Sequence, residues 1–317
     1  MDALSDVLRA VRLTGAIFFD LHASEPWVAE TPQGQSIVGK IFPDAEHLIP
    51  YHVVTQGAAW GSVGDEPPIP LATGDVIVFP HGDAHTMAST PGLHGTPNTS
   101  LYHRPGNQQL PFSISMGGES GEPSHIVCGY LGCDATPFNP LLAALPRVIH
   151  VPARVGGAIG KFVQFAMAEA NERRPGGEIV LEHLSELMFV DVVRRYLETL
   201  PAGRTGWLAA LREPFVGRAL TALHRSPAHG WTLESLSHEV GLSRSALAER
   251  FTQFVGHPPM QYLANWRMQV ATGLLANGSD NVAQVAFAVG YESEAAFSRA
   301  FKRLVGAPPA SWRKAQA

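Results

Sequence analysis

An internal repeat in the C-terminal third of this 317-residue chain limits its fold more than any other feature. Residues 240–262 read VGLSRSALAERFTQFVGHPPMQY, and residues 289–312 read VGYESEAAFSRAFKRLVGAPPASW. The positions that correspond in the two copies are Phe251 and Phe301, Gly256 and Gly306, Pro258 and Pro308, and Tyr262 and Trp312. The repeat therefore indicates one structural unit that was duplicated and has since diverged.

Each copy has the pattern of a helix, a tight glycine turn and a second helix. In the first copy, Thr232 is the expected N-cap of the helix TLESLSHEV, Gly241 permits the turn, and SRSALAERFTQFV is the second helix. In the second copy, NVAQVAFAV, Gly290 and SEAAFSRAFKRLV take the same places. The residues expected in the core are Leu236, Val240, Leu247, Phe251, Val285, Val289, Phe297 and Phe301. The pattern predicts two helix-turn-helix motifs, at about 232–256 and 281–306.

A long helix is predicted between the two copies. Residues 260–275 contain QYLANWRMQVATGLL and would span about 24 Å at 1.5 Å per residue. A recognition helix fits the major groove of B-DNA, and equivalent positions of that groove recur about 34 Å along one face. A rigid helix would hold two reading heads at a fixed separation, so that one chain could read two adjacent segments of groove.

Residues 214–312 resemble the DNA-binding domain of the AraC/XylS family of bacterial transcription regulators. The segment GYESEAAFSRAFKRLVGAPPASWR matches the family signature almost throughout. The N-terminal part resembles the cupin-type regulatory domain of one branch of that family, including LLAALPRVIHV, so the resemblance covers essentially the whole chain. It implies double-stranded promoter DNA as a partner and, for an activator, RNA polymerase.

The resemblance also places base-facing positions early in each second helix. They are Ser245, Ala248 and Glu249 in the first copy and Glu294, Ala295 and Arg299 in the second. Arg299 is the best single candidate, because its guanidinium can bond guanine O6 and N7. Glu249 can accept from cytosine N4 but repels phosphate, and it departs from the basic or amide residue common in relatives. The second copy is therefore expected to make more of the direct contact.

Phosphate contacts are expected from basic residues on or beside these helices. The candidates are Arg244, Arg250, Arg267, Lys302 and Arg303. Such contacts position a protein on DNA without specifying sequence. The charge distribution agrees, because from Gly206 onward there are 11 Lys and Arg against 7 Asp and Glu, a net charge of +4. The rest of the chain has 12 Lys and Arg against 21 Asp and Glu, a net charge of −9. The acidic total of the whole chain therefore does not argue against a nucleic-acid partner for the basic C-terminal part.

The N-terminal part is predicted to be a small β-barrel. Residues 37–85 contain short runs of Val, Ile, Phe and Trp separated by Gly, Pro and Asp, as in short antiparallel strands. The segment GDVIVFPHGDAH resembles the second cupin motif, GxxxxxPxGxxHxxxN. It matches at Gly74, Pro80, Gly82 and His85, with Ser89 in place of the final Asn.

The metal ligands that the cupin resemblance implies are incomplete. His52, in YHVVTQG, is the remaining histidine of the first motif, with Pro50 in place of its partner histidine and Gln56 near the position of the glutamate. The candidate ligands for a divalent metal are His52, Gln56 and His85, joined by Cys128 if its side chain points into the barrel. The alternative, which we favour, is that His52 and His85 are hydrogen-bonded interior residues and that no cofactor is required.

The middle of the chain is predicted to be helical and to carry dimerisation. One apolar stripe consists of Ile159, Phe162, Val163, Ala166 and Ala170. A second pattern, over 179–200, has an apolar face wider than one packing surface needs, which suggests a C2 partner. The alternative is that both stripes are internal. PAGRTG at 201–206 predicts a linker, because its Pro and two Gly cannot continue a helix.

No apolar run approaches the roughly 18 to 20 residues that a membrane span needs. The first residues, MDALSDVLRAVRL, lack the basic start and apolar region of a secretory signal. We therefore expect a cytoplasmic protein that does not bind membranes. Its two cysteines, Cys128 and Cys133, are expected to be reduced there.

Together these patterns predict an α+β chain with three parts. Residues 1–150 form a cupin-like β-barrel that senses a signal, 151–205 a helical dimerisation segment and linker, and 206–317 an all-α domain with two helix-turn-helix motifs joined by a linker helix. The predicted function is a sequence-specific DNA-binding transcription regulator, not an enzyme, that acts as a homodimer under the control of a small-molecule or redox signal.

Two alternatives remain open. One is a metal-dependent cupin enzyme fused to DNA-binding helices, which the incomplete ligand set disfavours. The other is a regulator that senses metal through His52 and His85 or oxidants through Cys128 and Cys133, since some relatives with this type of sensor respond to reactive chlorine through cysteines. A sensing cysteine needs an accessible thiol with a lowered pKa, and we favour buried structural cysteines instead.

Overall fold

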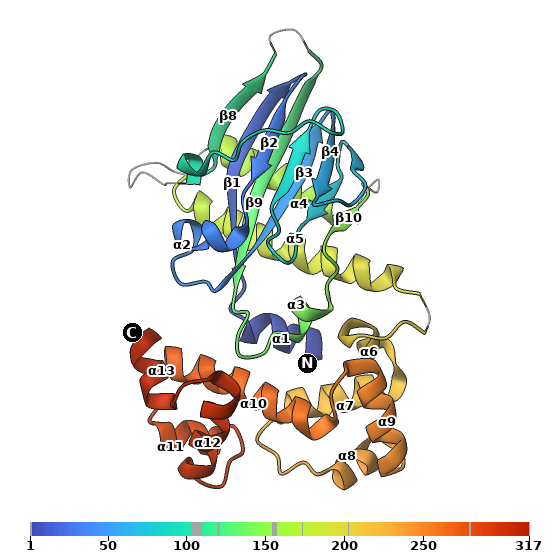
Figure 1. The fold of residues 1–317 in the computed structure, drawn as a ribbon, viewed down its shortest axis with the longest axis vertical. Coiled ribbons are helices and arrows are strands. Elements are labelled where there is room, and N and C mark those ends of the chain that lie inside the picture. Colours follow the sequence, from blue (N-terminus) through green and yellow to red (C-terminus); the bar gives the residue numbers. More distant parts are fainter. Residues whose placement is uncertain are drawn as a thin grey trace. The chain divides into compact units, whose positions relative to one another are not determined.

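The computed structural model describes residues 2–102, 110–118, 121–153, 157–172, 174–201, 203–278 and 280–316 (Figure 1). Its contacts divide the chain into two compact units. The sheet unit is Leu13–Cys133 with Leu145–Thr199, and the helical unit is Met1–Arg12 with Asp134–Ala144 and Leu200–Ala317. Each unit is made of segments that are separated in the sequence, whereas the predicted domains, divided near residues 150 and 205, are continuous segments of chain. Those boundaries stay a prediction.

Ten strands in the described part of the sheet unit form two β-sheets. They are β1 Thr14–Ser24, β2 Val28–Thr31, β3 His47–Gln56, β4 Ala58–Val63, β5 Ile69–Ala72, β6 Val76–Val78, β7 His85–Ala88, β8 Phe112–Gly117, β9 Pro123–Cys133 and β10 Ile149–Val151. One sheet has the order β10-β6-β3-β9-β1-β8 and the other β2-β7-β4-β5. The strands predicted within 37–85 are present, except that the start of this segment forms a short helix, α2 Val38–Ile41, after the 3-10 turn η1 Gly34–Ser36. A second 3-10 turn, η2, spans Thr99–Tyr102.

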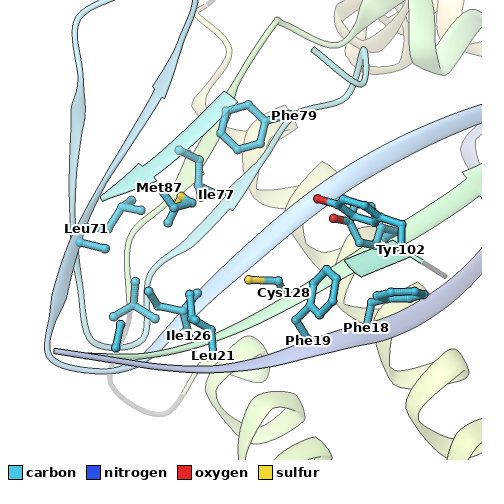
Figure 2. Packing of buried hydrophobic residues seen from close by; sticks show 14 of the residues in the cluster. Phe18, Phe19, Leu21, Leu71, Ile77, Phe79, Met87, Tyr102, Ile126 and Cys128 are labelled. Carbon is cyan, nitrogen blue, oxygen red and sulfur yellow. The ribbon is translucent and has the colours of Figure 1, made fainter. Parts of the chain in front are cut away.

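The core of the sheet unit lies between the two sheets. Figure 2 shows Leu71 and Met87 of the four-stranded sheet together with Phe19, Ile126 and Cys128 of the six-stranded sheet, all of which are buried. Aromatic rings pack against one another within this core, and the ring centroids of Phe18 and Phe19 lie 4.8 Å apart. β3 is buried from Leu48 to Val54 and β9 from Ile126 to Cys133, because both faces of these strands are covered.

Two helices, α4 Ala158–Glu172 and α5 Gly177–Thr199, cover the outer face of the six-stranded sheet, as Figure 1 shows. A Cβ at Gly15 would lie 2.6 Å from Ser185 Cβ, so glycine on β1 is what lets α5 approach. Ser185 Oγ donates to Leu181 O at 2.9 Å, and it lies 2.7 Å from the hydroxyl oxygen of the buried Tyr51, with which it shares a hydrogen bond. The two predicted helices are confirmed, and the chain leaves α5 at the predicted linker.

The helical unit contains ten described helices. They are α1 Ala3–Ala10, α3 Pro140–Ala144, α6 Trp207–Arg212, α7 Pro214–Arg225, α8 Leu233–Val240, α9 Arg244–Val255, α10 Pro259–Asn277, α11 Val282–Ala288, α12 Glu294–Val305 and α13 Pro309–Gln316. In Figure 1, α10 runs between the α8–α9 pair and the α11–α12 pair. Its 19 residues span about 28 Å at 1.5 Å per residue. Both helix-turn-helix motifs and the linker helix are thus confirmed.

The first helix and the segment around α3 belong to the helical unit because side chains tie them to α10. Gln269, which is buried, donates from Nε2 to Ala10 O and accepts at Oε1 from Phe138 N, each at 3.0 Å. Arg12 and Asp134 form a bidentate ion pair, in which Nε and Nη2 of the arginine each lie 2.8 Å from a carboxylate oxygen. No pattern within 1–12 or 134–144 predicts these long-range contacts.

No helix among the described residues combines the length and the apolar character that crossing a membrane requires. The longest, α5, has 23 residues, and Asp, Glu and Arg side chains recur along it.

Candidate functional site

The second helices of the two motifs, α9 and α12, begin and end in the same way. Ser243 Oγ accepts a hydrogen bond from Ala246 N at 3.2 Å, and Ser293 Oγ accepts one from Ala296 N at 3.2 Å. Both helices end at a left-handed glycine, Gly256 with φ +83° and Gly306 with φ +93°. Serine satisfies a free amide of the first turn, and glycine adopts positive φ without strain. Local chemistry therefore sets the ends of both recognition helices.

The turns between the paired helices also use left-handed glycines, but their surroundings differ. Gly241 has φ +75° and Gly290 has φ +84°. A Cβ at Gly241 would meet nothing within 4 Å, whereas one at Gly290 would lie 2.6 Å from Ala228 O. The second turn is therefore packed against the chain after α7, and the first is not.

The predicted core of the motifs is confirmed. The side chains with no exposed surface are Leu236, Val240, Leu247, Phe251, Val285, Val289, Phe297 and Phe301. In α12 the burial of Phe297 and Phe301, four residues apart, turns the opposite side of the helix to solvent. This packing decides which side chains of each recognition helix can reach a ligand.

The predicted base-contact residues lie on the solvent side of the recognition helices. The exposed ones are Ser245, Glu249, Glu294, Ala295 and Arg299, while Ala248 is partly buried. In α12, Arg299 follows Ala295 by one turn and precedes Arg303 by one turn, so the three share one face. Their contact with DNA stays a prediction, but their positions leave them accessible.

The predicted phosphate contacts fall into two groups. Arg244, Lys302 and Arg303 are exposed. Arg250 is already engaged, because its Nε lies 3.0 Å from Glu213 Oε1 and its guanidinium lies 5.2 Å from the Phe215 ring.

Arg267 is also engaged. Its Nε donates to Pro227 O at 2.8 Å and its Nη2 to His229 O at 2.9 Å, and its guanidinium lies 5.7 Å from the Tyr291 ring. These contacts tie α10 to the chain after α7 and to the second motif. The environments of Arg250 and Arg267 favour a structural role, and their phosphate contacts stay a prediction.

The sheet unit brings two predicted ligands together, His52 on β3 and His85 on β7. Their Nε2 atoms lie 2.7 Å apart, and both side chains are buried. His85 Nδ1 lies 2.8 Å from Asp83 O, which can only accept, so this nitrogen donates and His85 Nε2 accepts from His52. Burial lowers the pKa of His85 to about 4, and burial with the neighbouring His85 holds the pKa of His52 well below its ordinary value.

These two histidines do not fit the metal centre that the cupin resemblance implies. Their Nε2 atoms share one hydrogen bond, and the Phe79 ring stacks on His85 with centroids 3.8 Å apart. Within the described residues, His52 and His85 belong to no group of three or more His, Cys, Asp or Glu ligand atoms within 4.8 Å of one another. Gln56 is exposed at the end of β3, four residues or about 13 Å along the strand from His52.

Cys128 faces the core beside His52, its cross-strand neighbour, but its chemistry is that of a buried thiol. Burial, followed by the charge of Asp20, raises its pKa, whereas a reactive cysteine needs a lowered one. Cys133 is buried as well, five residues further along β9. That separation is about 17 Å and places the two side chains on opposite faces, which prevents a disulfide between them.

A third group of polar side chains lies on the outer face of the six-stranded sheet, where no site is predicted. Asp20 and His22 on β1 and His125 on β9 have ligand atoms within 4.8 Å of one another. Burial raises the pKa of Asp20, but the hydrogen bond and charge of His125, followed by those of His22, lower it more, so its pKa lies below the ordinary value. The D-x-H spacing of residues 20–22 was the only local signal, and it does not identify His125 as a neighbour.

Comparison with known proteins supplies a further line of evidence. A family model described as Cupin matches residues 2–198, and one described as a helix-turn-helix domain matches residues 236–315. The chain is 33% identical to a protein of Streptomyces lividans over 99% of this chain and 98% of the other, and 34% identical to one of Streptomyces antibioticus over 99% of each. Both are described as AraC-like transcription regulators. It is also 27% identical, over 99% of each chain, to the HTH-type transcriptional regulator AlkR of Acinetobacter baylyi.

Proposed function

The chain belongs to the AraC-like family of DNA-binding transcription regulators, and from this we propose that its two helix-turn-helix motifs read two successive segments of promoter major groove. The observation that carries the proposal is the pairing of two capped motifs on one linker helix, α10, within a single compact unit. Recognition helices of one protein bind neighbouring groove segments when their separation is fixed.

The two motifs are proposed to contribute unequally. The solvent face of α12 carries Arg299, Lys302 and Arg303, whereas the corresponding face of α9 carries Ser245 and Glu249. Guanidinium and ammonium groups attract the phosphate backbone, and only the guanidinium also pairs with guanine in two places. We therefore assign most of the direct readout to α12.

Replacing Arg299 with alanine is expected to weaken binding to a cognate promoter by about 1 to 3 kcal/mol and to relax the base preference at one position. The reason is the loss of a bidentate hydrogen-bonded contact between the guanidinium of Arg299 and the O6 and N7 atoms of a guanine. Fluorescence anisotropy with the full chain, a promoter fragment selected by the wild-type protein and a single-base variant series would measure both effects.

Two further variants serve as controls in the same titrations. Lys302→Ala is expected to weaken binding to all sequences alike and to lower the salt slope by about 1, as for a phosphate contact. Arg9→Ala removes the same charge from α1, outside both motifs, and is expected to leave affinity unchanged. Equal affinity of wild type and Arg299→Ala for the promoter would refute the assignment of Arg299.

We also propose a homodimer formed through α4 and α5. Three of the five large apolar side chains that are exposed among the described residues lie on these helices, namely Phe165, Ile179 and Leu187, each about half exposed. The other faces of the helices pack on the sheet and on each other. A surplus apolar surface of this kind is most simply covered by a second copy of the chain around a two-fold axis.

The double substitution Phe165→Glu and Leu187→Glu is expected to raise the dimer dissociation constant roughly tenfold or more, because it places unpaired charges in an apolar contact. Sedimentation velocity over a concentration series would measure the change. Leu101→Glu, at an exposed apolar position of η2, is the matched control and should leave association unchanged. A monomeric wild-type protein at micromolar concentration would contradict the proposal.

We propose that the sheet unit senses the signal that controls DNA binding and does not catalyse a reaction. A signal that binds one arrangement of the chain more tightly shifts the population toward that arrangement and changes promoter occupancy or contact with RNA polymerase. The pair His52 and His85 does not support a cupin enzyme, because among the described residues no third His, Cys, Asp or Glu completes a ligand group with them. A protein that binds promoters works beside the chromosome, in the cytoplasm.

A further inference from the structure

The group formed by Asp20, His22 and His125 is built into two neighbouring strands. His22 on β1 pairs with His125 on β9 in the antiparallel register, and their rings stack with centroids 4.2 Å apart and planes 13° apart. Asp20 lies two residues before His22 and therefore on the same face of the sheet. Phe19 and Leu21, whose positions alternate with these, point into the core. The three polar side chains are thus held on the outer face by strand geometry.

The ligand atoms of the group are already close together. His22 Nε2 lies 3.2 Å from Asp20 Oδ2, and His125 Nε2 contacts Asp20 Oδ1. Ligand atoms on one tetrahedral zinc ion are roughly 3.3 Å apart, given bond lengths of about 2.0 to 2.1 Å. Only small side-chain rotations would therefore direct all three atoms at one point. Asp20 and His125 are largely buried, with 18% and 16% of their side chains exposed, which limits the other positions they can take.

A polar cavity adjoins the group. It has a volume of about 380 Å³ and is lined by His22 and His125 together with Gln56, Ser24, Ser115 and Ser124. This space admits a cation and the water that would complete its coordination shell. Gln56 thus lies in the same pocket as His22 and His125, and not beside His52 and His85 as the cupin motif suggests.

We propose that Asp20, His22 and His125 bind one divalent transition-metal cation of the zinc class, with water from the adjoining cavity as a further ligand. Two imidazoles and a carboxylate suit Zn²⁺, Ni²⁺, Cu²⁺ or Fe²⁺, whereas Mg²⁺ and Ca²⁺ prefer oxygen ligands alone. A metal would replace the direct contacts that both histidines make with Asp20. The alternative is that the three residues form only a hydrogen-bonded ion-pair network, in which case the protein has no specific affinity for a metal at this place. Metal titration distinguishes a binding site from such a network.

The test uses the full chain without a histidine tag, stripped of metal with a chelator. Isothermal titration with Zn²⁺ should give one ion bound per chain, and Co²⁺ should give visible absorption bands of a site with nitrogen and oxygen ligands. His125→Ala and His22→Ala should each weaken Zn²⁺ binding by at least roughly 10- to 100-fold. His22 is half exposed, so its replacement keeps the test valid even if His125→Ala fails to fold. A millimolar excess of Mg²⁺ should not compete.

His94→Ala and His52→Ala are the controls. His94 is an exposed histidine beside Glu30 and should not affect the titration. Stoichiometric binding that His52→Ala abolishes and His22→Ala leaves unchanged would overturn the assignment, and so would the absence of a saturable site for both Zn²⁺ and Co²⁺.

Discussion

Replacing Gly290 with alanine is expected to lower the free energy of unfolding of the helical unit by about 2 to 5 kcal/mol and to abolish specific promoter binding. Part of this loss comes from the backbone, because a residue with a Cβ at φ +84° is strained by about 1 to 2 kcal/mol. The rest comes from the surroundings. The new Cβ would lie 2.6 Å from Ala228 O and 2.7 Å from Ala228 Cα, closer than real contacts allow.

The neighbours of Gly290 cannot move aside easily. Arg267 Nη2 would lie 2.8 Å from the new Cβ, and the same guanidinium is held by its hydrogen bonds to Pro227 O and His229 O. Relief of the clash would therefore shift the turn between α11 and α12. Since α12 is the proposed main reading head, its displacement should remove base-specific affinity as well as stability.

Gly241→Ala is the matched control, because Gly241 holds the same place in the first motif with φ +75° and no atom within 4 Å of a Cβ. It should show only the backbone strain, about 1 to 2 kcal/mol. Urea unfolding of the full chain followed by circular dichroism, with anisotropy measurements of promoter binding, would compare the two variants. Equal losses in both would show that the contact with Ala228 contributes nothing.

Acidification from pH 7 to pH 4 is expected to destabilise the sheet unit by about 3 kcal/mol. His85 has a pKa of about 4 in the folded chain, against an ordinary value of 6.5, because it is buried. Between these values the unfolded chain binds a proton that the folded chain does not, so stability rises with pH. The stability that neutral His85 contributes is complete above pH 6.5 and is lost as pH falls toward 4. His52, also buried, acts in the same direction.

Hydrogen exchange of peptides that cover β3 and β9, corrected for the intrinsic pH dependence of exchange, would measure this loss. A local readout is needed because burial also lowers the pKa of His224, in the helical unit, to about 3. The double variant His52→Gln and His85→Gln should be less stable at pH 7 but should lose less protection between pH 6.5 and 4.5. His94→Gln, at an exposed position, should keep the wild-type slope. An unchanged slope in the double variant would exclude the buried pair as its source.

Features that depend on short stretches of chain are well predicted from the sequence. Thr232, the expected N-cap, accepts a hydrogen bond from the backbone amide of Ser235, only three residues away. The turn glycines Gly241 and Gly290 adopt the positive φ that a tight turn between two helices requires. The apolar positions of α9 and α12 follow the helical period, so the exposed positions follow from them. Both recognition helices and the accessibility of Arg299 could therefore be expected without coordinates.

Residues that meet across long separations are not predictable in this way. Asp20 contacts His125 across 105 positions only because β1 pairs with β9, and that pairing carries no short-range signal. Gln56 is separated from His52 for a local reason instead, because the two residues lie four positions apart on one extended strand. The partners of Arg250 and Arg267 are a helix-capping carboxylate and two backbone carbonyls, which no pattern of charged residues indicates.

The two copies of the repeat show where the division lies. The amino-acid sequence alone predicts two helix-turn-helix motifs, a linker helix and a glycine at each turn. These features depend on hydrogen bonds and on a helical periodicity within about twenty residues of chain. Only the folded chain distinguishes Gly241, whose left-handed turn is open, from Gly290, whose turn is packed against Ala228 and Arg267. The physical reason is that conformation at a turn is local, whereas the space around it is filled by residues brought there by the rest of the fold.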